Sequence, residues 1–420
     1  MSYDAIIVGG RVAGASTAML LARKGLRVLV VDRAKFPSDT LSSHQLQPPG
    51  AARLRRWGLL DALETAGTPP TREVRFCTGD IVLRGRYPSD AALYSPRRTL
   101  LDALLVDAAR AAGAEVRENT IVDEVLTADG RVIGIRCHAK GSPAQTEHAR
   151  IVVGADGKHS LVARTAQART YRERPPRSLA FYTYWQDVPL DTVELYSSER
   201  RLAGAFPTND GLTITYVGWP LAEFDVFRRD PLANVHATLD AAGTLGERVR
   251  AGGHVGPLRG TVDLPNAFRR PYGPGWALAG DAGLVMDSIT GQGIGHALRD
   301  ADLLAAAVAD GLGGTTPLRK ALAGYAKARD RETKAMYDMT VRLASFAVQS
   351  AAERRLFAAL ADDREAASRF FGVISGTVPP AAFFTPANLV RLVGVGGFAA
   401  LARGQLRPAQ PNARAASTAQ

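Results

Sequence analysis

The 420-residue sequence has little cysteine, no long apolar run and no stretch in which basic residues alternate with aromatic ones. Its two cysteines, Cys77 and Cys137, are too few for a disulfide framework or a cysteine-bound metal, so we expect a reducing compartment and no metal site. No apolar run reaches the roughly 18 residues of a transmembrane helix, and the sequence opens on a strand-like segment rather than a secretion signal. We therefore expect a cytoplasmic protein without stable membrane insertion.

Charge alone would suggest a nucleic-acid-binding protein, because the formal net charge is +11. The basic residues are mostly arginines scattered along the chain, so we expect no nucleic-acid partner. An anionic substrate or cofactor phosphates account for part of the charge equally well. With 46% hydrophobic residues the chain can bury a large core, and its length is typical of two closely packed domains.

The N-terminal segment predicts a βαβ unit with short loops, and hence a parallel sheet. Residues 3–8 form a strand, residues 13–24 a helix rich in small residues, and residues 27–32 a second strand. Gly9 and Gly14 hold the first and third places of a dinucleotide-binding turn, which need a tight bend and close helix–strand contact. Arg11 stands at the second place, where the backbone approaches the pyrophosphate.

Two roles are open for Arg11: a bidentate bond to the pyrophosphate or a position near the flavin, and an ion pair with a neighbouring acid. Asp32 ends the second strand, where its carboxylate can accept hydrogen bonds from both hydroxyls of a ribose. An unphosphorylated ribose favours FAD or NAD over NADP in this site.

Three further segments point to the same kind of site. "VVGADGKHSLVAR" delivers Asp156 and Gly157 into a turn after a short strand at residues 151–153, and Arg98 opens a helix predicted over residues 100–112. A strand at residues 275–279 ends in Gly280 and Asp281, and a Gly-Gln-Gly turn then opens a long helix at Gly293. The N-terminal amides of that helix can receive an anion or a carbonyl oxygen.

In this order and spacing, these motifs resemble those of FAD-dependent oxidoreductases of the aromatic-hydroxylase type. That group also includes geranylgeranyl-reductase-like enzymes and flavin-dependent halogenases, and the resemblance covers roughly residues 3–345. It implies a Rossmann-like, α/β FAD-binding domain with an inserted antiparallel-sheet substrate domain and C-terminal helices. Because one dinucleotide-binding fold is recognisable, NADH or NADPH is implied as a transient reductant.

The resemblance also implies roles for individual residues. Asp32 holds the adenosine ribose, the Asp156 motif bears on FAD and nicotinamide binding, and Asp281 holds the flavin-side ribose or ribityl chain. Ser288 stands where many relatives have a proline that fixes φ. The residues expected at the cofactor are Gly9, Gly10, Arg11, Ala13, Gly14, Asp32, Arg33, Ser43, Gln45, Arg98 (with Arg97 as the weaker candidate), Val122, Asp156, Gly157, Gly280, Asp281, Gly291, Gln292, Gly293 and Ile294.

Residues 178–219 alternate aromatic and polar side chains, which predicts an antiparallel sheet over the substrate. Each aromatic residue there either lines the pocket or simply buries a sheet face. His44 is the one candidate general base with a positional argument; the alternative is a histidine hydrogen-bonded to FAD or to the backbone. The expected substrate residues are Tyr184 (or Tyr182), Trp185, Tyr196, Phe206, Tyr216 and Trp219.

The favoured reaction is hydroxylation or epoxidation of an aromatic or polyketide-like small molecule with NAD(P)H and O2, through a flavin C4a-hydroperoxide. The main rival is reduction or oxidation of a substrate double bond, since residues 10–16, 36–44 and 181–188 are similar to geranylgeranyl reductases. Halogenation is disfavoured because the tryptophans Trp57, Trp185, Trp219 and Trp276 are isolated. A non-enzymatic, membrane-peripheral role rests on the apolar segment 388–403, which could equally pack on the core.

The chain divides into seven predicted segments. Residues 1–75, 98–175 and 271–350 form the FAD-binding domain, and residues 76–97 and 176–270 form the substrate domain. A helical region follows at 351–404, and residues 405–420 form a polar tail that we expect to be disordered. Both a monomer and a homodimer are compatible with the sequence.

Overall fold

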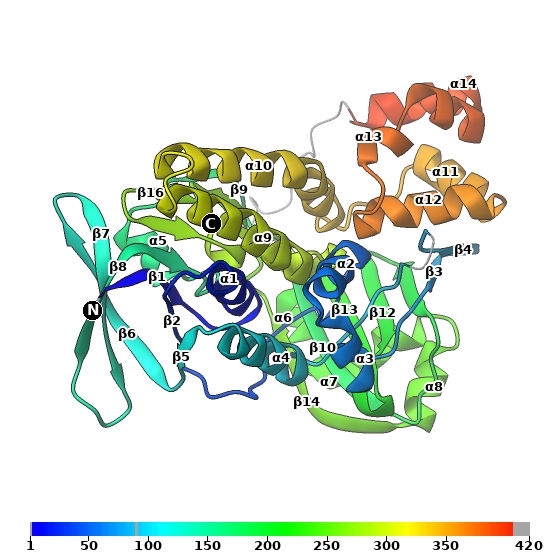
Figure 1. Cartoon of the computed structure of the whole chain (residues 1–420). Coiled ribbons are helices and arrows are strands. Elements are labelled where there is room, and N and C mark those ends of the chain that lie inside the picture. Colours follow the sequence, from blue (N-terminus) through cyan, green and yellow to red (C-terminus); the bar gives the residue numbers. More distant parts are fainter. Residues whose placement is uncertain (1, 89–90, 406–420) are drawn as a thin grey trace, which may run out of the picture.

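The computed structural model describes residues 2–88 and 91–405 (Figure 1), so the expected tail lies, apart from residue 405, outside the described residues. An eight-stranded sheet forms the first layer, in the order β16-β17-β8-β1-β2-β5, with β7 bonded to β8 and β6 bonded to β7. Five of these strands run parallel. Its strands are β1 (Tyr3–Val8), β2 (Val28–Val31), β5 (Glu115–Arg117), β6 (Thr120–Ala128), β7 (Arg131–Ala139), β8 (Gln145–Gly154), β16 (Tyr272–Gly273) and β17 (Trp276–Leu278).

Helices cover this sheet because its central strands are apolar on both faces. All four residues of β2 are buried, and so are nine of the eleven residues of the first helix, α1. One buried apolar cluster joins β1 to α1, α4 and α9. The helices of this domain are α1 (Val12–Ala22), α2 (Pro48–Trp57), α3 (Leu60–Thr65), α4 (Arg98–Ala111), α5 (Leu161–Thr165), α9 (Gly293–Leu312) and α10 (Leu318–Leu343).

A seven-stranded sheet forms the second domain, in the order β14-β10-β13-β12-β11-β3-β4. It is antiparallel apart from the β11–β3 pair, which is parallel and joins the later strands to β3 and β4 from the earlier part of the chain. The exact domain boundaries stay predictions. Its strands are β3 (Glu73–Thr78), β4 (Ile81–Arg86), β10 (Ser178–Gln186), β11 (Val193–Ser198), β12 (Arg201–Pro207), β13 (Thr213–Pro220) and β14 (Gly253–Thr261).

Two groups of helices cover the two faces of this second sheet (Figure 1). One face packs on α6 (Phe224–Phe227), α7 (Pro231–Asp240) and α8 (Leu245–Ala251). The other packs on α11 (Ala351–Ala361), α12 (Arg364–Ser375), α13 (Pro380–Phe383) and α14 (Pro386–Gln405). A small sheet of β9 (Thr170–Arg174), β15 (Asn266–Arg269) and β18 (Leu284–Val285), together with the 3-10 turns η1 (Asn209–Gly211), η2 (Leu221–Glu223), η3 (Gly280–Ala282) and η4 (Ser288–Thr290), completes the fold.

These observations confirm the predicted fold class, with two differences in its elements. The strand expected at residues 151–153 begins at Gln145, because its first half pairs with β7 before its second half enters the parallel sheet. The segment 388–403 lies in α14, which is kinked at Gly394, and places Leu389 and Val393 in the buried cluster. Among the described residues, no helix combines the length and apolarity needed to cross a bilayer.

Candidate functional site

The turn between β1 and α1 requires glycine at the two predicted places. Gly9 has a φ of +99°, and a Cβ added there would press on the Ala155 carbonyl group. A Cβ on Gly14 would overlap the carbonyl oxygen of Gly9. No side chain caps the N-terminus of α1, so its first amides remain available. A bare helix N-terminus behind a close glycine turn fits a phosphate-bearing cofactor such as FAD.

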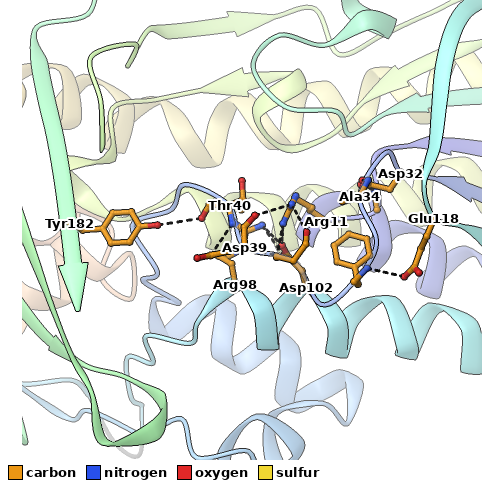
Figure 2. A network of polar contacts seen from close by, with 12 residues as sticks. Arg11, Asp32, Ala34, Asp39, Thr40, Arg98, Asp102, Glu118 and Tyr182 are labelled. Atoms are coloured by element: carbon orange, nitrogen blue, oxygen red, sulfur yellow. Dashed lines mark hydrogen bonds and ion pairs between the residues drawn. The ribbon is translucent and has the colours of Figure 1, made fainter. Parts of the chain in front are cut away.

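Asp32 is held in a fixed orientation at the end of β2. Its Oδ2 accepts the amide of Gly10 at 2.6 Å and its Oδ1 accepts the amide of Ala34 at 2.7 Å (Figure 2). The residue is only 8% exposed. Each carboxylate oxygen keeps a second lone pair, so the group can still accept a ribose hydroxyl. This geometry suits the predicted role.

Arg11 turns its guanidinium toward α4 and the chain after β2. Its Nη1 donates to Asp102 Oδ2 at 2.6 Å, and its Nη2 donates to Ser38 Oγ at 2.9 Å. Asp102 is fully buried and also accepts from Nε and Nη2 of Arg98. Of the two roles considered for Arg11, the structure therefore shows the ion pair with a neighbouring acid.

The η3 turn leaves the Asp281 side chain accessible to solvent. The amide of Gly280 donates to Asp300 Oδ2 at 3.1 Å, which fixes the turn against α9. Desolvation by the surrounding protein raises the pKa of Asp281 to about 6, and the positive charge of Arg98 opposes the rise. An accessible carboxylate at this place can accept a hydrogen bond from a bound sugar or ribityl chain.

The loop before α9 leaves open space at the helix start. Gly291, with a φ of +62°, lies against the Gln45 side chain, and Gln292 Nε2 donates to Ile374 O at 2.8 Å. A Cβ on Gly293 would meet no atom within 4 Å, so these amides are not covered by side chains at that position. Asp287 caps the turn at the amide of Ile289, at 3.0 Å. Its carboxylate therefore holds the loop next to Ser288.

The Asp156 turn is less clearly a ligand site. Its Oδ2 accepts the amide of Leu161 at 2.6 Å, so this carboxylate caps α5 together with Ser160. Its Oδ1 is buried without a hydrogen-bond partner among the described residues, and burial raises its pKa. Gly157 follows with a φ of +78°. One unpaired carboxylate oxygen therefore remains available.

The other predicted cofactor residues differ in exposure. Ala13 lies against Gly280, so α1 meets the η3 turn directly. Ser43 is half-buried, Val122 is half-buried beside the apolar cluster of β6–β8, and Arg33 is exposed. The FAD contacts of all these residues stay predictions.

His44 is completely buried and neutral. Its Nε2 lies 2.8 Å from the Tyr184 hydroxyl, and the Tyr182 ring meets it edge-on at 4.8 Å between centroids. Burial, helped by the positive charge of Arg98, lowers its pKa to about 3. Nδ1 has no partner among the described residues. An imidazole with so low a pKa is a weak base, so the geometry favours a neutral hydrogen-bonding partner.

The six predicted substrate residues divide between the two faces of the second sheet. Tyr184, Phe206 and Tyr216 lie in the cluster that faces the C-terminal helices. On the opposite face, the remaining three belong to the core against α7 and α8, with their polar atoms bonded within the domain: Trp185 to Thr215, Tyr196 to Glu194 and Trp219 to Thr238. The three residues on the α7–α8 face therefore bury a sheet face, which is the alternative given above, and the substrate contacts of the other three stay predictions.

Sequence reasoning missed Asp102, which lies four residues after Arg98 on α4. Oppositely charged residues at this spacing share one helix face, so the pair could have been found from the sequence. Arg259, which pairs with Asp39 at 3.4 Å, carried no such signal. Among the described residues, no group of three His, Cys, Asp or Glu side chains is placed to hold a metal ion.

Comparison with known proteins agrees with this site. Residues 2–340 match the family model described as FAD binding domain. The chain therefore belongs to this family of FAD-dependent oxidoreductases.

Two curated relatives cover most of the chain. Digeranylgeranylglycerophospholipid reductase 2 of Methanothermobacter thermautotrophicus is 27% identical over 314 residues, which are 70% of this chain and 74% of that protein. Menaquinone reductase of Mycolicibacterium smegmatis is 29% identical over 326 residues, which are 73% and 76% of the two chains.

Solved structures show the same fold. The flavin-dependent brominase Bmp2 superposes with a TM-score of 0.78 at 18% identity, covering 96% of this chain and 99% of that one. PqsL of Pseudomonas aeruginosa, described as a probable FAD-dependent monooxygenase, superposes with a TM-score of 0.69 at 24% identity, covering 89% and 99%. At these identities the likeness establishes the architecture and leaves the reaction open.

Proposed function

We propose that the protein is an FAD-dependent monooxygenase that takes electrons from NADH or NADPH and transfers one oxygen atom of O2 to an apolar, aromatic or polyketide-like small molecule. FAD would lie between the α1 N-terminus, Asp32, Asp281 and the amides of Gly291–Ile294. Bound there, it would accept a hydride and pass the electrons on, chemistry that no side chain provides. The protein supplies position, water exclusion and hydrogen bonds.

The enclosed aromatic surroundings of His44 carry this proposal. His44, Tyr182 and Tyr184 are each 5% exposed or less, and their rings meet edge-on. Buried aromatic side chains keep water away from neighbouring atoms, which would protect reactive oxygen species from wasteful breakdown. Because His44 is neutral, its Nδ1 would offer the cofactor or substrate a hydrogen bond without bringing a charge to the site.

Reduction of a substrate double bond is the second candidate. The two curated relatives above are named as reductases, and their matches cover 70% and 73% of this chain. Apolar surroundings suit an isoprenoid chain as well as a phenol. Both reactions begin with the same reduced cofactor, so they differ only in whether O2 is required.

Purified protein tests the proposal in two stages. A yellow colour that NADH or NADPH bleaches establishes the redox role and excludes a non-enzymatic one. A panel of phenols, polyketides and isoprenoids is then screened for faster NAD(P)H oxidation, with peroxide release measured in parallel. Conversion that needs O2 supports oxygen transfer, whereas conversion by the reduced protein without O2 establishes the reductase instead.

A further inference from the structure

The chain between β2 and α2 passes three parts of the molecule in turn. We call residues 38–45 the bridging loop. Figure 2 shows its start between Arg11 and α4 on one side and Tyr182 of the seven-stranded sheet on the other. Its far end carries His44 and Gln45, which face the aromatic cluster and the Gly291 turn. The loop therefore touches both the cofactor side and the substrate side of the site.

Among the described residues, the side-chain hydrogen bonds between the nucleotide-binding turn and the bridging loop all come from Arg11. It donates to Ser38 O at 3.3 Å, to Ser38 Oγ at 2.9 Å and to Asp39 O at 3.3 Å. The same guanidinium donates to Asp102 at 2.6 Å. Its side chain is 27% exposed, whereas that of Asp102 is fully buried. The arginine thus fastens the loop to α4 at the point where the fingerprint normally has glycine.

The opposite side of the loop is fastened to the second sheet. Asp39 Oδ2 lies 3.4 Å from Arg259 on β14, and the Tyr182 hydroxyl reaches Thr40 O at 3.5 Å. Tyr182 and Arg259 are direct partners across the β10–β14 pair. An unbroken set of polar contacts therefore runs from the nucleotide-binding turn to the strand that carries Tyr184.

We infer that Arg11 is a positioning residue: it holds the bridging loop so that His44 and Tyr184 are aligned with the cofactor site. Its guanidinium is held by Asp102, which also binds Arg98, so the uncapped N-terminus of α1 is left to receive the pyrophosphate. The inference concerns the FAD site alone and holds for either reaction proposed above.

The position needs arginine rather than lysine. A planar guanidinium presents several donors in a fixed fork, so one group can bind the Asp102 carboxylate and three loop oxygens together. A lysine ammonium carries the same charge but is a compact point, and it cannot span Asp102 and Ser38 in this geometry. Lysine therefore separates the effect of charge from the effect of shape.

Arg11→Gly and Arg11→Lys test the inference, with Lys24→Gly as a matched control that removes an exposed cation from the same βαβ unit. Hydrogen exchange of residues 38–45 and the dissociation constant of FAD are measured for each. We expect exchange to rise about tenfold in both Arg11 variants, because the loop opens locally. FAD affinity should change less than about threefold, and Lys24→Gly should match the wild type.

A third measurement is the visible circular dichroism of bound FAD, which reports the surroundings of the flavin ring. It should change in both Arg11 variants and not in the control. Ser38→Ala removes only the Ser38 Oγ acceptor, so it keeps the inference testable if an Arg11 variant fails to fold. We expect it to raise hydrogen exchange in the loop by a smaller factor. Unchanged exchange in the folded variants would overturn the inference. So would a large loss of FAD in Arg11→Gly that Arg11→Lys restores, because that pattern belongs to a charge acting on the pyrophosphate.

Discussion

The β1–α1 turn and the aromatic face of the seven-stranded sheet both adjoin the bridging loop, but different forces fix their geometry. Contacts between backbone atoms fix the geometry of the turn, since Gly9 and Gly14 leave no space for a Cβ. Contacts between side chains fix the geometry on the sheet, since His44 is positioned by Tyr182 and Tyr184. A backbone-determined site tolerates few residue types, whereas a side-chain-determined site can change its substrate while the fold persists.

The largest effect should come from the turn. Gly14→Ala places a Cβ on the Gly9 carbonyl, so we expect FAD to be lost and stability to fall by about 1–3 kcal/mol, as overpacking costs. FAD content and urea denaturation measure both. Gly324→Ala is the control, because a Cβ there meets nothing within 4 Å in an exposed part of α10. It should leave FAD unchanged and raise stability slightly. Full FAD retention in Gly14→Ala would contradict the backbone argument.

His44→Gln should act on the reaction rather than on the cofactor. The variant loses the imidazole that meets Tyr184, so we expect turnover to fall about 100-fold through misplacement, with FAD still bound. Tyr184→Phe removes the same hydrogen bond from the other side and should cause part of the loss. Steady-state rates and FAD titration separate the two effects. If His44→Gln loses FAD instead, His44 belongs to the cofactor site.

The pH dependence of stability tests whether His44 is buried in its neutral form. The pKa of His44 is about 3 in the folded chain and near its ordinary 6.5 when unfolded, so the unfolded state takes up a proton first as the pH falls. Stability is therefore lost below pH 6.5. Between pH 7 and 5 we expect the wild type to lose about 2 kcal/mol more than His44→Gln. The pKa of Asp287 is raised to about 6, so its protonation stabilises the folded chain as the pH falls. This contribution is the same in both proteins and drops out of their difference. Equal pH profiles would mean that His44 is hydrated.

The smallest functional effect should come from the far face of the sheet. Trp219→Phe removes the bond to Thr238 Oγ1, which costs about 1 kcal/mol of stability. Because this face packs on α7, substrate-induced changes in flavin absorbance should stay as in the wild type. Phe206→Leu, on the face toward the C-terminal helices, is the matched comparison and should alter them. Equal substrate-induced changes in flavin absorbance in the two variants would contradict the assignment of these residues to different faces.

Much of the cofactor half could be predicted from local chemistry. A glycine turn, an acid at a strand end and a helix beginning at Gly293 each depend on a few neighbouring residues, and the structure has all three where they were expected. The FAD contacts of these residues stay predictions. Arg11 was ambiguous because its partner Asp102 is 91 residues away, a distance that no local pattern spans.

The substrate half was harder to predict because the facing of a strand depends on its register with distant strands. Tyr196 and Trp219 could be assigned to a face only once β11, β12 and β13 were paired. Trp185 is different: it follows Tyr184 directly, and alternation along a strand already puts neighbours on opposite faces. The opposite facing of Tyr184 and Trp185 could therefore be predicted from the sequence alone.

The most direct test of the proposed reaction is a single turnover with the first substrate that the panel identifies. The protein is reduced with NAD(P)H without O2, mixed with this substrate, and divided between an anaerobic vessel and one supplied with isotopically heavy O2. Oxygen transfer predicts no conversion in the first vessel and one heavy oxygen atom per product molecule in the second. Full conversion in the anaerobic vessel would contradict the monooxygenase proposal and establish double-bond reduction.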